Sequence, residues 1–364
     1  MNITSLNFAG FLIVTLIMYY ILPRRQQNWL LLVMSYAFYV TWSWFYAAML
    51  AGLTLVNFAL AGYIRKPTPD NYKGRPQVNR AVLWAGIGVN LAALAFFKYE
   101  DFFVPDLRAQ LSEWSADTGL GTIDLLLPVG MSFYVVTVIS YLLDISRGQA
   151  DPPAGLNGLI DFGVYMAYFP KLLAGPIERA RSFMPKLAEQ RIVDNDVMSR
   201  SFALIVIGVV RKAVIADTLF RTFPADLWNK PASFSAFQLI GFLIVYGFAL
   251  YNDFAGYTSV ARGVSGLFGI ELSRNFNLPY TARNLSEFWN RWHITLSNWL
   301  RDYVYYPASR ALLRRNPSRT NMANAIFPPL LTMFVSGLWH GPGWTMVLWG
   351  MLHGVYLVGE RLLA

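Results

Sequence analysis

The chain has 364 residues, of which 55% are hydrophobic and 14% are charged, and its formal net charge is +9. The charged fraction lies far below the roughly 25% of an ordinary soluble domain, and the apolar residues suffice for roughly ten membrane spans. These values exclude a disordered chain, disfavour a soluble globule and indicate a polytopic helical membrane protein.

The first three apolar runs predict spanning helices. Residues 6–22 lack a basic leader and a small-residue cleavage site, so we expect a retained helix and not a signal peptide. Residues 29–64 are long enough for two helices, with a turn or interface at residues 41–44. Residues 81–99 form the next predicted span.

The loops on either side of residues 81–99 differ in charge. Residues 65–80 carry five basic side chains against one acid, whereas residues 100–124 carry one basic side chain against six acids. Cytoplasmic loops of membrane proteins are enriched in Lys and Arg. We therefore place the first loop in the cytoplasm, the second outside and the N-terminus outside. The positive net charge then reflects membrane topology and not binding to nucleic acid.

The middle of the chain holds one broken and two continuous apolar runs. Residues 125–143 form a span opened by Pro128, and residues 156–173 are interrupted by polar residues and Pro170, which predicts a broken or re-entrant helix. Residues 202–220 contain Arg211 and Lys212, which either meet an anionic substrate or, as the sequence favours, extend to the interface.

The pattern changes after the predicted span at residues 234–251. Polar residues become frequent over residues 252–306, where Trp289, Trp292 and Trp299 are interleaved with Arg and Asn, and this predicts amphipathic helices at an interface or along a cavity. A basic stretch at residues 310–319 predicts a second cytoplasmic loop, and two final spans are expected at residues 323–339 and 344–362.

Three histidines are the first candidates for acid–base chemistry near neutral pH. His340 lies between two apolar segments beside small residues that would let a substrate approach, and an ionisable group at membrane depth needs a partner or a cavity. His293 follows polar residues at helical spacing. It therefore lies either on a functional polar face or in an aromatic belt at the interface, and the local sequence favours neither. On one continuous helix, His353 would lie about 140° and ~20 Å away from His340, so we interpret it as structural.

Other chemistries are disfavoured by what the sequence lacks. Without Cys, disulfides, thiolate catalysis and Cys-ligated metal centres are excluded. No HxxxH pair and no acidic cluster accompanies the histidines, so no metal site is expected. No G-x-S-x-G motif is present for a serine hydrolase.

An ordered set of motifs resembles the membrane-bound O-acyltransferase superfamily, and in particular its bacterial branch. Upstream motifs are LPVGMSFY at 127–134, YLLD at 141–144 and AGPIER at 174–179. Downstream motifs are DFAGY at 253–257, NFN-x-PY at 275–280, SEFWNRWH at 286–293, WLRDY at 299–303 and GLWHG at 337–341. That branch includes alginate and peptidoglycan O-acetylation proteins and D-alanyl transfer proteins of teichoic acid modification. A Gly-Gly-containing loop usual in the alginate type is replaced here by Ala308, Ser309 and Arg310.

The resemblance implies an all-α ring of about 9–11 transmembrane helices with re-entrant or interfacial helices around a central tunnel. It implies one membrane-embedded O-acyltransferase domain over residues 1–364, with its signature at 251–343. The invariant histidine of the family corresponds to His340, the general base, with an acyl-His intermediate as the alternative. The second histidine corresponds to His293, which orients or binds substrate. Other expected tunnel-lining residues are Asn252, Asp253, Asn290, Arg291, Trp292, Ser297 and Trp339.

The expected activity is acyl transfer, most simply of acetyl, in a bacterial cytoplasmic membrane. The acyl group would come from a cytoplasmic thioester, acetyl-CoA or an acyl carrier protein, used as a substrate and not as a bound cofactor. It would reach an extracytoplasmic polysaccharide directly or through a partner acetyltransferase. The alternative within the class is D-alanyl transfer toward teichoic acid. An alternative of another class is a non-catalytic transporter or flippase, which the lack of an inverted repeat disfavours.

Overall fold

The computed structural model describes residues 1, 3–65, 77–103, 113, 127–315, 317 and 322–363. In this part of the chain nearly all residues are helical, and the sole β-type pairing is an isolated bridge between Arg65 and Val78. The described chain forms two compact units. Unit 1 comprises residues 1–49, 160–178 and 182–275, and unit 2 comprises residues 50–159, 179–181 and 276–364.

Unit 1 contains two N-terminal helices and a long helical pair. Helices α1 (Leu6–Ile21) and α2 (Arg24–Val40) are followed by α3 (Trp44–Ile64), which enters unit 2, so the predicted turn at residues 41–44 is confirmed. Ser5 caps α1 by accepting a hydrogen bond from the backbone N–H of Phe8 at 3.2 Å.

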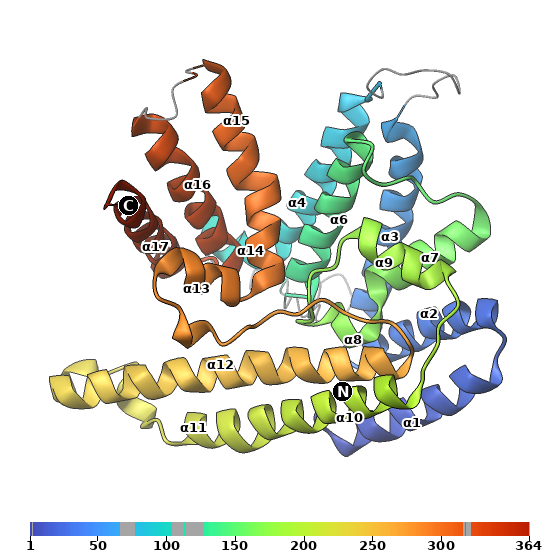
Figure 1. The fold of residues 1–364 in the computed structure, drawn as a ribbon, viewed down its shortest axis with the longest axis horizontal. Coiled ribbons are helices and arrows are strands. Elements are labelled where there is room, and N and C mark those ends of the chain that lie inside the picture. The colour runs from blue at the N-terminus through green and yellow to red at the C-terminus, as the bar shows by residue number, and fades with distance from the viewer. Residues whose placement is uncertain are drawn as a thin grey trace. The chain divides into compact units, whose positions relative to one another are not determined.

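The long pair in unit 1 consists of α10 (Asn195–Val209) and α12 (Ala236–Leu267), which lie side by side (Figure 1). A π-helical turn at Val210–Ala216 joins α10 to α11 (Asp217–Arg221). The two backbones approach closely because a Cβ on Gly256 would lie 2.8 Å from the carbonyl oxygen of Gly208. Helix α12 runs 32 residues, so our expectation that the span ends at residue 251 is wrong.

The predicted broken helix is confirmed. Helix α7 (Gly155–Ala167) stops at Tyr168, and the short α8 (Phe169–Leu172) begins beyond it with Pro170 in its first turn, where proline is tolerated. Helix α9 (Ala180–Ala188) follows the AGPIER motif.

Unit 2 contains the segment that the sequence marks as its signature. Its N-terminal part holds α4 (Arg80–Phe103) and α6 (Met131–Ser146). Its C-terminal part holds α13 (Leu285–Arg291), α14 (Ile294–Leu300), a π-helical turn (Arg301–Tyr305), α15 (Tyr306–Arg315), α16 (Met322–His340) and α17 (Trp344–Leu363). Helices α16 and α17 pack as a pair (Figure 1). Helix α16 ends at His340, and Gly341, Pro342 and Gly343 separate it from α17, so the histidines at 340 and 353 do not share one continuous helix.

Four described helical stretches are long and apolar enough to cross a membrane: Trp44–Ile64, Arg80–Tyr99, Ala236–Leu267 and Met322–His340. Helices α1 and α6 are shorter apolar helices. These findings confirm an all-helical, polytopic membrane protein. Most of the two loops used to assign topology, including residues 66–76 and 104–112, lies outside the described residues, and their sidedness stays a prediction.

Candidate active site

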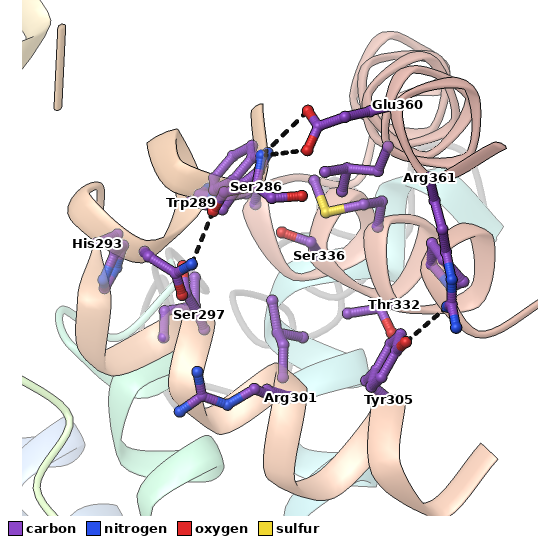
Figure 2. Close-up of a pocket in the computed structure, with 17 residues that line it drawn as sticks. Ser286, Trp289, His293, Ser297, Arg301, Tyr305, Thr332, Ser336, Glu360 and Arg361 are labelled. Carbon is purple, nitrogen blue, oxygen red and sulfur yellow. Dashed lines mark hydrogen bonds between the residues drawn. The ribbon is translucent and has the colours of Figure 1, made fainter. Parts of the chain in front are cut away.

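A cavity of about 470 Å³ lies within unit 2 and brings two of the three histidines together. His293 and His340 both line it, although 46 intervening positions separate them in the printed sequence. Its walls come from α13, α14, the π-helical turn, α16 and α17 (Figure 2). The cavity is therefore built by the signature segment and the two C-terminal helices.

His340 is the last residue of α16, and its exposed side chain faces the cavity. The helix break that follows is caused by Gly341, Pro342 and Gly343, because proline cannot continue a helix and glycine lowers helix propensity. The rings of Trp339 and Trp349 flank the imidazole with centroids 5.0 and 5.1 Å away. The histidine is thus held between two indoles at a helix end.

Helix α16 reaches this position because it packs closely on α17. A Cβ on Gly350 would lie 3.2 Å from the Cα of Gly337, and a Cβ on Gly337 would lie 3.3 Å from the Cα of Gly350. Small residues allow such close approach between membrane helices. The glycine of the GLWHG motif therefore sets the depth of the histidine beside α17.

The carbonyls at the C-terminus of α16 are satisfied from α4. Lys98 Nζ donates to the carbonyl of Trp339 and to Ser132 Oγ at 3.1 Å, and Tyr99 Oη donates to the carbonyl of Leu338. Trp339 Nε1 donates to the carbonyl of Ser132 at 3.2 Å. A cation near a helix C-terminus complements the negative end of the helix dipole. These bonds explain how a helix can end within the protein beside a catalytic candidate.

His293 lies between α13 and α14 in a left-handed conformation with φ 41°. Such backbone is uncommon for a residue other than glycine and is concentrated at functional sites. The side chain is 2% exposed, and its ring contacts Phe133 and Trp339 with centroids 6.1 and 5.9 Å away. Burial, with a smaller contribution from the charge of His340, lowers the pKa of His293 well below its usual range. A neutral imidazole is therefore held against the ring that also contacts His340.

Two more predicted residues line the cavity. Asn290 Nδ2 donates to the carbonyl of Ser286 at 2.9 Å, and Ser297 Oγ donates to the carbonyl of Trp292 at 3.1 Å. Trp289 also lines it, and in the described structure its buried Nε1 has no hydrogen-bond partner. These groups supply polar contacts in a mainly apolar cavity, as is usual for sites that orient small molecules.

Three predicted lining residues do not line the first cavity. Arg291 pairs with Glu287 at 2.5 Å and donates to Thr281 Oγ1 at 3.1 Å, which braces the preceding loop. Trp292 stacks on Phe288 with centroids 5.6 Å apart. Trp339 lines a second, almost wholly apolar cavity of about 390 Å³ in the same unit. None of the three is among the residues lining the first cavity, although the Trp339 ring contacts both His293 and His340.

Asn252 and Asp253 belong to unit 1, where both lie inside α12. Asn252 Nδ2 donates to the carbonyl of Phe248 at 2.9 Å, and Asp253 forms an ion pair with Lys212 at 2.7 Å. Neither residue lines the cavity of unit 2. Their role in substrate binding stays a prediction, and the visible role of Asp253 is charge neutralisation.

Several cavity features were not predicted from sequence. His353 contacts Trp289 and Trp349 with centroids 5.3 and 4.8 Å away, so it supports the aromatic wall near His340. Glu360 accepts a hydrogen bond from the backbone N–H of Leu285 at 2.8 Å and so caps α13. The cavity is also lined by Arg301, Tyr305 and Arg361. Arg301 lies within the WLRDY motif and Tyr305 lies two residues after it, and only that motif could have drawn attention to them.

The profile of the MBOAT, membrane-bound O-acyltransferase family, matches residues 142–364. The chain belongs to this family. It is 37% identical over 97% of its length to a probable alginate O-acetylase AlgI of Pseudomonas putida, covering 69% of that protein. It is 32% identical over 98% of its length to a peptidoglycan O-acetyltransferase of Helicobacter pylori, covering 70% of that protein. A teichoic acid D-alanyltransferase of Streptococcus thermophilus is 30% identical over 65% of this chain, covering 58% of that protein.

The family resemblance predicted from the motifs is confirmed, as is the assignment to an acyltransferase family. The family profile includes both cavity histidines and the whole cavity lining. Among the alginate relatives, coverage falls to 64% for the protein of Pseudomonas aeruginosa. The chain thus spans about two thirds of the length of its acetylating relatives.

Proposed function

We propose that this protein transfers an acetyl group from a cytoplasmic thioester to a hydroxyl of an extracytoplasmic polysaccharide, directly or through a partner acetyltransferase, in a bacterial cytoplasmic membrane. The observation that carries the proposal is the meeting of His293 and His340 at one cavity within a membrane-bound O-acyltransferase. The printed names of the alginate and peptidoglycan relatives support acetyl as the transferred group.

The reaction needs orientation and one proton transfer, because a thioester carbonyl is already reactive. Nε2 or Nδ1 of His340 removes the proton from the acceptor hydroxyl while that oxygen attacks the thioester carbonyl. The new C–O bond forms, the C–S bond breaks, and the imidazolium returns its proton to the departing thiolate. The indoles that flank His340 restrict the imidazole to this position.

His293 supports the reaction from the neighbouring wall. Its ring contacts Trp339, which in turn contacts His340. Because burial keeps His293 neutral, its imidazole can exchange one hydrogen bond with a substrate without placing a second charge in the cavity. We assign it to substrate orientation.

D-alanyl transfer is the second candidate, favoured by the teichoic acid D-alanyltransferase relatives. Mass spectrometry of the cell-surface polymers, with and without this protein, separates the two. A mass increment of an acetyl ester that depends on the protein supports the proposal. An increment of an alanyl ester supports the second candidate, and unchanged polymers overturn both.

A further inference from the structure

Three cavity-lining residues follow one another along a single helical rod. His293 is the N-cap residue of α14, Ser297 lies within α14 and Arg301 begins the π-helical turn, so the three are spaced four residues apart, and all three line the cavity (Figure 2). Residues four apart lie on the same helix face. At 1.5 Å per residue, Arg301 lies about 12 Å along the rod from His293.

The direction of this rod shows which of the three residues lies nearest the predicted cytoplasmic side. Beyond the π-helical turn it continues as α15, whose last turn carries Arg314 and Arg315 at the start of the predicted cytoplasmic loop. A molecule that approaches from that side passes Arg301 before it reaches the histidines. An acyl donor that extends along the rod would therefore place its reactive end at the histidines and its other end at Arg301.

Arg301 has free hydrogen-bonding capacity in this position. Its side chain is 45% exposed, and its nearest carboxylate, that of Asp302, lies 3.9 Å away, beyond hydrogen-bonding distance. Within the described part of the chain its guanidinium group makes no hydrogen bond. A cation in a membrane protein that faces a cavity without a hydrogen-bonded carboxylate is a candidate for substrate binding.

The other two charged residues of the cavity are already engaged. Arg361 donates to Tyr305 Oη at 2.7 Å, and the Glu360 carboxylate accepts backbone N–H bonds from Leu285 and Ser286. These contacts leave Arg301 as the lining group suited to an additional anion. A guanidinium group presents paired N–H donors that match the oxygens of a phosphate.

We propose that Arg301 binds the phosphate group at the end of a phosphopantetheine arm whose thioester lies at His340 and His293. This inference rests on the proposed function. The pantetheine arm is the flexible linker between a thioester and its phosphate, so it can follow the rod from Arg301 to the histidines. Coenzyme A and an acyl carrier protein share this chemistry, and the cavity recognises the part that they have in common.

The test measures ligand binding without requiring turnover. Purified full-length His340→Ala protein is titrated with 4′-phosphopantetheine and with pantetheine, which lacks the phosphate. We expect the phosphorylated ligand to bind about 10- to 100-fold more tightly, as for a hydrogen-bonded charge pair. When Arg301→Gln is added to the His340→Ala protein, this preference should disappear, while Arg301→Lys should retain part of it. The control Arg310→Gln removes a charge from α15 that does not line the cavity and should leave the preference intact.

Equal binding of both ligands by the His340→Ala protein, or an unchanged preference for the phosphorylated ligand after Arg301→Gln, would overturn the inference. Repeating the titration with coenzyme A and with a phosphopantetheinylated carrier protein identifies which source adds affinity beyond the shared arm. A transfer assay on the protein that retains His340 is scored separately. Phosphate-dependent binding without any transfer would contradict the proposed function and leave the Arg301 assignment standing.

Discussion

The structure contains a π-helical turn in each unit, and two cations on these turns, Lys212 and Arg301, have opposite surroundings. In unit 1, the turn at Val210–Ala216 carries Lys212, which pairs with Asp217 and Asp253 at 2.7 Å each. In unit 2, the turn at Arg301–Tyr305 carries Arg301, which faces a cavity without a carboxylate within hydrogen-bonding distance. π-helical turns occur frequently at functional sites, and of these two lysine and arginine side chains Arg301 is the one that lines the histidine cavity.

A charged side chain within an apolar helix is structural or functional according to the partners that it meets. Lys212 is neutralised by two acids, so its charge contributes to the packing of α10 and α12. Arg301 is left available beside the histidine pair, so its charge can act on a substrate. The same helical distortion is structural in one unit and, on our proposal, functional in the other.

The largest expected effect comes from removing the general base. His340→Ala should lower polymer acetylation roughly 10²- to 10⁴-fold, the usual contribution of general acid–base catalysis, while expression and folding are preserved. Acetate released from the purified surface polymer measures the effect. The matched control His353→Phe keeps a ring against Trp349 and should retain most activity. Full acetylation by His340→Ala would remove the histidine from the mechanism.

The next largest effect is expected from a larger side chain at the close contact between α16 and α17 that positions His340. Gly350→Val should lower the free energy of unfolding by about 1–3 kcal/mol or more, because its Cβ would lie within 3.2 Å of the Gly337 Cα and still closer to the Met333 carbonyl oxygen of α16. Thermal unfolding in detergent measures the loss. Gly359→Val lies on the same helix, where an added Cβ meets nothing within 4 Å, and should unfold like the parent. Equal stability of the two variants would show that the close approach is unimportant.

Breaking the ion pairs of unit 1 tests the structural half of the comparison. Lys212→Met leaves two half-buried acids without their cation and should cost about 1–3 kcal/mol of stability. Phosphopantetheine affinity, measured on the folded fraction, should stay unchanged. Lys212→Arg preserves the charge and should recover most of the loss. A drop in ligand affinity with stability intact would instead make this turn functional.

The smallest effect is expected at the cap of α13. Glu360→Gln keeps an oxygen that can accept a hydrogen bond from Leu285 N–H but loses the negative charge at the N-terminus of α13. The free energy of unfolding should fall by about 0.3–1 kcal/mol. Turnover should fall slightly because α13 leads directly into His293, whereas the preference for phosphate should persist. Turnover and the preference for the phosphorylated ligand are measured side by side on the same variant. Loss of the preference would place Glu360 in ligand binding.

Local sequence signals predicted much of the fold. Polar residues and Pro170 predicted the break between α7 and α8, and the aromatic turn predicted the junction of α2 and α3. The end of α12 was not predictable in this way, because Asp253 inside the helix pairs with Lys212 from a segment that is distant in the sequence. The ring of helices and its central tunnel stay predictions.

The candidate site was predictable in its histidines and not in its surroundings. Motifs singled out His293 and His340, which both line one cavity. The assumption of one continuous helix placed His353 away from the site, whereas the Gly-Pro-Gly break returns it to the indole beside His340. Glu360 and Arg361 carry no local signal, since their importance arises from contacts made with α13 and the π-helical turn.

Acetyl transfer by the purified protein in proteoliposomes tests the acyltransferase activity and the role of His340 most directly. Isotope-labelled acetyl-CoA is supplied on one side, and label in an added hydroxylated oligosaccharide or partner acetyltransferase is followed over time. We predict labelled product and stoichiometric free coenzyme A with the parent protein, and neither above background with folded His340→Ala. Equal transfer by both proteins, or none by the folded parent with either acceptor, would contradict the account.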